Sequence, residues 1–348
     1  MHTQRWVRWF RSRGHEVRVW SLEPGPAELG AEPLPSAPLP GALRYPLAVP
    51  ALRRALAAYG PNVIDAHFVP NYGLMGALTG RHPLVVSAWG SDLLAGGTAD
   101  PLRAARARFV LSRADAIIAD GDNLAAAARR LGGGSHVHMI PWGIDVERYR
   151  LGAARERGLI LSTRMHEPVY DIPTVFRAAR DVLAREPRAR LVVAGAGSLT
   201  AELQALAAAL LPPGRWSFIG RLDADAMADW LGRAEVYVSA SRSDSTSVSL
   251  LEAMACGALP VVTDIEGNRS WVRDREGART FPPGDAAVLA TALTDTLADP
   301  VWAEAARRLN RERVERDGDA SVNMMRIEQL FESLATVDGA SSTQTRFR

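Results

Sequence analysis

Two carboxylates, Asp244 and Glu252, stand eight positions apart around a helix start that is rich in serine and threonine. The apolar run 236–239 predicts a strand, and the loop after it predicts a capped helix whose free backbone N–H groups can hold a diphosphate. A carboxylate accepts hydrogen bonds from a vicinal diol, so Asp244 is placed for a sugar and Glu252 for a ribose. The pattern predicts a site for a sugar nucleotide.

Short β-branched runs alternate with helical patterns from residue 16 onward, which indicates two successive doubly wound α/β units with parallel sheets. The segment 141–150, with Pro and Gly and no periodicity, is expected to connect them. The stretch 23–40 is expected to be an irregular surface loop, whereas 322–335 has the apolar spacing of a helix that covers a core. The expected strands are 16–21, 63–67, 84–88, 116–119 and 136–140, then 159–163, 190–194, 216–219, 236–239 and 260–263.

Length and charge are consistent with a two-domain protein, because 348 residues can build two cores. Residues 1–150 carry 17 Arg against 12 acids and residues 151–348 carry 24 against 27, and every basic residue is Arg. The single Cys256 allows no intramolecular disulfide, which indicates a reducing compartment. With no apolar run of about 18 residues and no secretory signal, the expected location is cytoplasmic, with peripheral contact on the cytoplasmic membrane face as a further option.

The segment from Asp244 to 262 resembles the signature of the retaining glycosyltransferases of group 1 (family 4). That signature has two acids separated by seven residues, the second opening a Glu-Ala-Met-Ala-x-Gly string that ends in Pro-Val-Val. Here Glu252 opens Glu-Ala-Met-Ala-Cys-Gly-Ala-Leu-Pro-Val-Val, and the first acid is Asp rather than the commoner Glu. The resemblance implies the GT-B fold, in which two Rossmann-like domains face each other across a cleft. It implies an acceptor-side domain at 1–145 with a crossover helix at 320–337 and a nucleotide-sugar domain at 146–319. The composition of 338–348 predicts a disordered tail.

The resemblance also assigns donor-site residues in the second domain. Arg164, at the end of that domain's first strand, is implied as a catalytic contact that makes paired hydrogen bonds to the departing diphosphate. The family usually adds a lysine a few residues on, where this chain has the uncharged Tyr170, so phosphate stabilisation falls to Arg164, the helix start and Arg242. The implied donor-binding residues are Gly195, Gly197, Gly220, Arg221, Thr246, Ser247, Val248 and Glu252.

Two segments of the first domain match the family's acceptor side. His67, in the string Asp-Ala-His-Phe-Val-Pro, takes the place of a strand-end histidine that faces the transferred sugar. Ser91 and Asp92 belong to a Gly-Ser-Asp turn that lines the cleft near the acceptor in the family. The catalytic set implied by the resemblance is therefore His67, Arg164 and Asp244.

The beginning of the sequence departs from the family pattern. Family members open with a strand and a Gly-rich loop, whereas this sequence starts at the helix that follows them. Either the start codon lies upstream or the domain lacks its first central strand. Trp6, Trp9 and Phe10 alternate with arginines, and we expect a core-facing aromatic stripe with a basic outer face rather than a membrane-surface helix.

Three Asp-x-Asp strings, at Asp120, Asp223 and Asp317, raise the alternative of a metal-dependent transferase. The first follows an expected strand, as that mechanism requires, but Asp122 also suits a helix cap. The two-unit architecture favours a site that needs neither a metal nor another cofactor.

The expected function is transfer of a hexose-type sugar, with retention, from a nucleoside diphosphate to a hydroxyl of a glycan or lipid-linked acceptor in cell-envelope polysaccharide or glycolipid synthesis. No nucleic-acid partner is expected. The alternative is a catalytically impaired nucleotide-sugar-binding or partner subunit, motivated by Asp244, Tyr170 and the absent first strand. The related two-domain sugar-nucleotide 2-epimerases are disfavoured, because their acid and base residues are not matched.

Overall fold

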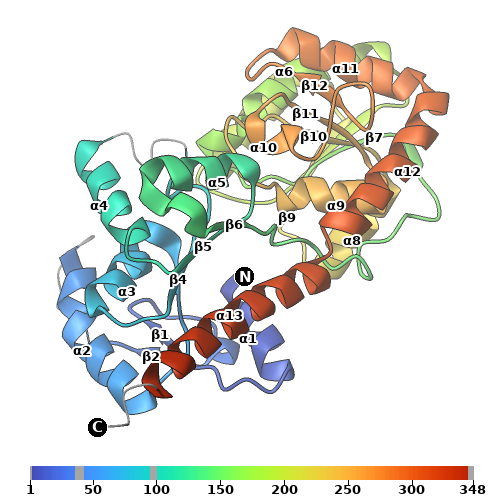
Figure 1. Ribbon diagram of the computed structural model, residues 1–348. Helices are drawn as coiled ribbons and strands as arrows, with labels where there is room; N and C mark the ends of the chain where they lie inside the picture. The colour runs from blue at the N-terminus through green and yellow to red at the C-terminus, as the bar shows by residue number, and fades with distance from the viewer. Residues whose placement is uncertain (1, 36–42, 95–99, 344–348) are drawn as a thin grey trace. The chain divides into compact units, whose positions relative to one another are not determined.

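The computed structural model describes the backbone of residues 2–35, 43–94 and 100–343 (Figure 1). The chain divides into two compact α/β units, one of Met1–Trp142 with Val322–Arg348 and the other of Gly143–Ser321. Each unit contains parallel sheet with helices packed against it. The division after residue 142 lies three residues before the one that the sequence indicates.

The second unit is built on one sheet of six parallel strands in the order β12-β11-β10-β7-β8-β9. Its strands are β7 (Glu156–Ser162), β8 (Arg190–Ala194), β9 (Trp216–Gly220), β10 (Ala234–Ser239), β11 (Leu259–Thr263) and β12 (Arg279–Phe281). Its helices are α6 (Ile172–Arg185), α7 (Thr200–Leu210), α8 (Ala224–Arg233), α9 (Val248–Cys256), α10 (Glu266–Arg269), α11 (Ala286–Ala298) and α12 (Pro300–Asp317). Strand β12 was not predicted, because three residues carry too short a pattern.

Alternation along the strands builds a core on each face of this sheet. On β10, Val236 and Val238 pack in one buried cluster together with Phe176 of α6. Tyr237, between them, packs in a second cluster with Leu250 and neighbours of α9. Side chains of a strand point alternately to opposite faces, so an unbroken apolar run is what a strand covered on both faces requires.

The first unit carries a four-stranded parallel sheet in the order β3-β4-β5-β6 and a separate parallel pair, β1-β2. The strands are β1 (Val19–Ser21), β2 (Ala31–Pro33), β3 (Ile64–His67), β4 (Leu84–Ser87), β5 (Ala116–Ala119) and β6 (Val137–Met139). The helices include α1 (His2–Ser12), α2 (Arg44–Tyr59), α3 (Leu74–Thr79), α4 (Pro101–Leu111), α5 (Asp122–Ala128) and α13 (Ala320–Thr343).

Two expectations for the first half of the chain need correction. The stretch 23–40 is not wholly irregular, because it contains a 3-10 turn (Ala27–Leu29) and β2, and β2 pairs with β1. Its last residues, 36–40, lie outside the described ranges. The strand expected from residue 16 begins only at Val19. The central strand that the family pattern leads us to expect would pair with both β1 and β3. No strand within residues 2–35, 43–94 and 100–343 does so.

Helices α1 and α13, far apart in the sequence, lie side by side in the first unit (Figure 1). Trp6 and Phe10 of α1 are buried, and the Phe10 ring stacks on Phe331 at 5.2 Å between centroids. The core-facing aromatic stripe is confirmed. Helix α13 runs on to Thr343, so the tail predicted to be disordered is helical as far as that residue, and 344–348 are outside the described part. None of the helices described is long and apolar enough to cross a bilayer.

Candidate functional site

The sheet of the second unit changes its winding direction between β7 and β10. The chain moves outward from β7 through β8 and β9, then returns to β10 and moves the other way, so these two neighbours mark a topological switch point. In open α/β sheets, ligands bind beyond the carboxyl ends of the strands at this point. Arg164 follows the end of β7, and Arg242 and Asp244 follow the end of β10. Topology alone brings these charged residues to one edge of the sheet.

Arg164 is buried, with 6 % of its surface exposed, and its guanidinium is held by protein groups. Nη2 donates to Asp244 Oδ2 at 2.6 Å, and Nη1 donates to the hydroxyls of Ser247 at 2.6 Å and Ser249 at 2.9 Å. Burial alone would lower the pKa of Arg164, but the adjacent Asp244 carboxylate raises it above its usual range. The site therefore holds a fixed positive charge.

Tyr170 covers one face of that charge. The Arg164 guanidinium carbon lies 4.2 Å from the centroid of the Tyr170 ring, a cation–π contact. Tyr170 ends a short 3-10 turn, Pro168–Tyr170, that leads into α6. Tyr170, which takes the place of the family's lysine, therefore orients the Arg164 cation but adds no positive charge of its own.

Helix α9 begins at the same place with a hydroxyl cap. Ser247 has an extended backbone, and its side chain accepts a hydrogen bond from the Leu250 N–H. Thr246, just before it, accepts from the Trp271 indole at 3.2 Å, and Val248 is the first helical residue. The N-terminus of α9 contributes partial positive charge beside Arg164, an arrangement that suits an anionic ligand.

Glu252 lies within α9 and is partly buried. The phenol of Tyr149 forms a hydrogen bond with its carboxylate; burial first, and then the Glu252 charge, raise the pKa of Tyr149 far above its usual value. Tyr149 thus remains a neutral donor that orients Glu252. No sequence pattern predicts this role, since Tyr149 lies in the segment expected to connect the two units.

Gly195 and Gly197 are required by packing inside the unit. A Cβ on Gly195 would lie 2.6 Å from the Arg164 carbonyl oxygen, and Gly195 has φ +113°. A Cβ on Gly197 would lie 2.5 Å from the His166 carbonyl oxygen. These glycines let the turn after β8 press against the turn that carries Arg164.

Gly220 differs from those two glycines, because a Cβ there would meet nothing within 4 Å. It has φ +71°, and its carbonyl accepts from the Gly195 N–H at 2.7 Å. Arg221, next in the chain, is exposed. Gly220 and Arg221 therefore lie on the solvent-exposed side of the turns that follow β7, β8 and β9.

His67, at the end of β3 in the first unit, has both ring nitrogens engaged. Nε2 is 2.7 Å from Asp65 Oδ2, and Nδ1 is 3.1 Å from the Thr3 hydroxyl. Asp65 also accepts from the Ser87 hydroxyl at 2.9 Å. The next residue, Phe68, has φ +78°, a strained backbone for a non-glycine residue and a feature found at functional sites.

Asp92 is buried, with 3 % of its surface exposed, and it accepts from the Val69 and Trp89 N–H groups at 3.0–3.1 Å. Burial raises the pKa of Asp92, although these backbone hydrogen bonds oppose the shift. Its carboxylate therefore holds the loops after β3 and β4 in place instead of facing solvent. Ser91 beside it is exposed.

Members of the Asp-x-Asp strings serve local structure. Asp223 caps α8, and Asp319 accepts from the Ser321 N–H. Asp122 is the first residue of α5 rather than its cap, which is Gly121, so that expectation was wrong. Among the described residues, the one trio with metal-compatible spacing is His15, Glu328 and Glu332, which belongs to none of these strings.

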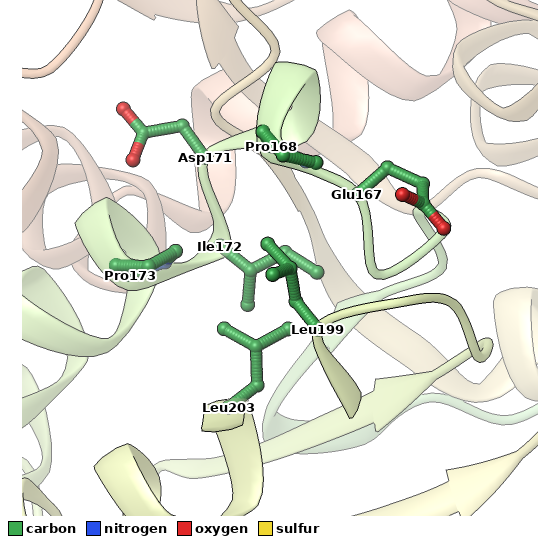
Figure 2. Close-up of a pocket in the computed structure, with 7 residues that line it drawn as sticks. All are labelled: Glu167, Pro168, Asp171, Ile172, Pro173, Leu199 and Leu203. Atoms are coloured by element: carbon green, nitrogen blue, oxygen red, sulfur yellow. The ribbon is translucent and has the colours of Figure 1, made fainter. Parts of the chain in front are cut away.

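A small pocket borders the turn that carries Tyr170, and Figure 2 shows its lining. Its volume of about 210 Å³ is below the range usual for small-molecule sites, and it shares no residue with the predicted site. Its lining residues are Glu167, Pro168, Asp171, Ile172, Pro173, Leu199 and Leu203. Glu167 closes one side by accepting from the Ser198 N–H at 2.8 Å, so the pocket belongs to the packing of two turns.

The strand order 3-2-1-4-5-6 of the second unit is that of a doubly wound, Rossmann-like α/β unit, and charged and hydroxyl groups lie at its switch point. The structure brings together Arg164, Asp244 and Ser247 by direct hydrogen bonds, with Glu252 on the same helix. His67, Ser91 and Asp92 belong to the first unit.

Comparisons with known proteins identify the family. Residues 1–143 match the model of the glycosyl transferase 4-like domain, and residues 144–315 match the model of glycosyl transferases group 1. The chain belongs to the group 1 (family 4) glycosyltransferases, which have the two-domain GT-B fold.

Two curated relatives are informative. The D-inositol 3-phosphate glycosyltransferase 2 of Catenulispora acidiphila is 33 % identical over 53 % of this chain and 49 % of its own length. The phosphatidyl-myo-inositol mannosyltransferase of Mycolicibacterium smegmatis is 30 % identical over 60 % of this chain and 54 % of its own length. The chain thus spans about half the length of the curated relatives it matches.

Solved structures support the fold. The sucrose-phosphate synthase of Thermosynechococcus elongatus has a TM-score of 0.81 at 20 % identity, covering 96 % of this chain and 92 % of that one. Anabaena HepE, solved with UDP and glucose, has a TM-score of 0.79 at 17 % identity, covering 96 % and 95 %. At these identities the likeness shows the fold alone.

Proposed function

We propose that this protein transfers a hexose-type sugar from a nucleoside diphosphate donor to a hydroxyl acceptor with retention of configuration at the anomeric carbon. The observation that carries the proposal is the Arg164–Asp244 pair beside the capped N-terminus of α9, at the switch point of the second sheet. A cation, a helix start and two carboxylates at one place match the parts of a nucleotide sugar: diphosphate, hexose and ribose.

Glycosyl transfer demands little covalent work from the protein. Negative charge grows on the leaving diphosphate, and preorganised donors aimed at that charge stabilise the transition state. Arg164 supplies a buried positive charge and the first turn of α9 supplies N–H donors, while Asp244 accepts from the hexose and Glu252, oriented by Tyr149, accepts from the ribose. The departing phosphate takes the acceptor's proton, so the mechanism needs no separate general base and no metal.

His67 is assigned to positioning of the transferred sugar. Asp65 fixes the ring through Nε2, which leaves Nδ1, now paired with the Thr3 hydroxyl, as the nitrogen that can exchange partners with a sugar hydroxyl. Asp92 is assigned to support of the loops near the acceptor, with the exposed Ser91 available for direct contact.

The acceptor class is proposed from the relatives. Two of them are named for inositol 3-phosphate and phosphatidyl-myo-inositol, so a phosphorylated inositol or an inositol lipid of the cell envelope is the first acceptor to test. We place the reaction in the cytoplasm or at the cytoplasmic membrane face, where sugar nucleotides are made.

Turnover of purified full-length protein tests the proposal. UDP-glucose, UDP-N-acetylglucosamine, GDP-mannose and ADP-glucose would each be incubated in EDTA with inositol 3-phosphate or phosphatidylinositol vesicles, and nucleoside diphosphate release and the product's anomeric coupling recorded. We expect release with one donor and a product of the donor's anomeric configuration. Inverted product would contradict retention, and binding without turnover of any donor would favour a sugar-nucleotide-binding subunit instead.

A further inference from the structure

A second arginine stands at the switch point, and it differs from Arg164 in its freedom to move. The Arg242 guanidinium donates from Nη2 to Asp171 Oδ2 at 2.7 Å. Its side chain is 56 % exposed, whereas the Asp171 side chain is 9 % exposed. The arginine can therefore leave this pair for another anion, while the carboxylate stays in place.

The backbone around Arg242 is anchored even though its side chain is exposed. The Arg242 N–H donates to the Val169 carbonyl at 2.8 Å, and the preceding Ser241 carbonyl accepts from the Thr263 hydroxyl at 2.6 Å. These bonds fix the turn after β10 against β11 and against the turn before α6. Any movement is thus confined to the guanidinium and its carbon stem.

Asp171 has a conformation that points to a specific role. It has φ +42° and ψ 45°, although it is not glycine, and it occupies the cap position of α6 without making a side-chain cap bond. Figure 2 shows its carboxylate directed away from Ile172, Leu199 and Leu203, the apolar part of the pocket lining. A strained residue persists where its surroundings determine it, and here the carboxylate is turned to Arg242 instead of to its own helix.

The charges at this edge of the sheet make Arg242 important. Arg164 is buried, with Nη donors engaged by Asp244, Ser247 and Ser249, and its neighbour Tyr170 carries no charge. The chain contains no lysine. A diphosphate arriving from solvent at this edge meets Arg242 as an exposed guanidinium held by one carboxylate.

We infer that the diphosphate of the donor competes with the Asp171 carboxylate for Arg242, so that Arg242 is a phosphate contact and Asp171 an internal anion that weakens donor affinity. The inference rests on the proposed function and assigns to it a residue pair that the family motif does not contain. A diphosphate can take two guanidinium donors, which favours it over the single hydrogen bond to Asp171. Release of the product then returns Arg242 to Asp171.

The test is the affinity of full-length variants for UDP, GDP and ADP, measured by calorimetry. Arg242→Gln should raise the Kd of the diphosphate that wild type binds by about fivefold to twentyfold, and Arg242→Lys should restore part of the loss. Asp171→Asn should lower that Kd by about threefold, because asparagine tolerates the same backbone but has no charge. In the Arg242→Gln background, Asp171→Asn should have no further effect.

Arg180→Gln is the matched control, since Arg180 is also an exposed arginine paired with an aspartate, Asp181, and it lies on α6. Its Kd should equal that of wild type. If wild type binds one of the diphosphates and Arg242→Gln binds it with the same affinity, this inference is overturned and the proposed function is not. Failure of wild type to bind any of the three diphosphates would overturn this inference and the proposed function together.

Discussion

Arg164 donates to Asp244 at 2.6 Å, and this bond joins the ends of β7 and β10 across 80 positions of sequence. The two strands are neighbours at the point where the sheet changes winding direction. The pair therefore lies at the base of the proposed donor site. There it contributes to the stability of the second unit as well as to the proposed chemistry.

The first prediction concerns that pair. Asp244→Asn leaves the buried Arg164 cation without its anion, so the free energy of unfolding should fall by about 1–3 kcal/mol in urea denaturation. Asp264→Asn is the control, because Asp264 pairs with an exposed partner, Arg269, and should cost about 0–1 kcal/mol. Equal losses in the two variants would show that the Arg164 pair is not a buried anchor.

The second prediction separates two glycines of the site. Gly195→Ala places a Cβ 2.6 Å from the Arg164 carbonyl oxygen at φ +113°, so it should displace the Arg164 turn and lower stability by at least about 2 kcal/mol. Gly220→Ala meets open space at φ +71° and should cost only about 1 kcal/mol of backbone strain. Thermal unfolding of both variants checks the order, and a larger loss for Gly220→Ala would refute the packing argument.

The third prediction concerns Tyr149. Removing its hydroxyl in Tyr149→Phe takes away the donor that orients Glu252, with little change of volume in the core. We expect the Kd for nucleoside diphosphate to rise about fivefold and the Kd for inorganic pyrophosphate to stay unchanged, because only the former has a ribose. Tyr59→Phe serves as the control, because Tyr59 lies in the first unit, far in sequence from Glu252. A rise for both ligands would mean that Tyr149 acts on the phosphate site.

The fourth prediction is a pH dependence in the first unit. Burial alone would raise the pKa of Glu328, but hydrogen bonds from His15, Arg13 and Trp9 together hold it below its usual range. A lowered carboxyl pKa contributes stability above the ordinary Glu value that is lost as pH falls through the folded-state value. Glu328→Gln should therefore lower the free energy of unfolding at pH 7 and match wild type more closely toward pH 3.5.

The control for that experiment is Glu312→Gln, because Glu312 is an exposed carboxylate on α12 outside this cluster. It should change the free energy of unfolding by less than about 0.5 kcal/mol at pH 7. A difference between Glu328→Gln and wild type that grows as pH falls would contradict the assigned sign.

Much of the second unit could be predicted from its sequence, because its signals are local. The run 259–262 is apolar throughout, and α9 has a serine cap at one end and Gly257 with φ +78° at the other. These features need no knowledge of distant residues. The same holds for the family motif, which lies within a single loop, helix and strand.

The contacts that define the site could not be predicted in this way. Tyr149 meets Glu252, and Arg242 meets Asp171, only because the sheet brings separate turns together. The motif assigns Asp92 to a turn near the acceptor, yet the fold buries its carboxylate against the Val69 and Trp89 amides. Which residue each of these side chains contacts depends on the tertiary structure and cannot be deduced from spacing along the chain.

Calorimetric titration of the full-length protein with UDP-glucose, GDP-mannose and ADP-glucose in EDTA tests the central claim most directly, which is that the second unit binds a nucleoside diphosphate sugar. We predict one-to-one binding of one of these donors with a Kd in the micromolar range, weakened by Ser247→Ala, which removes the α9 cap and an Arg164 partner. No heat with any of the three, from protein that shows a cooperative unfolding transition, would contradict it.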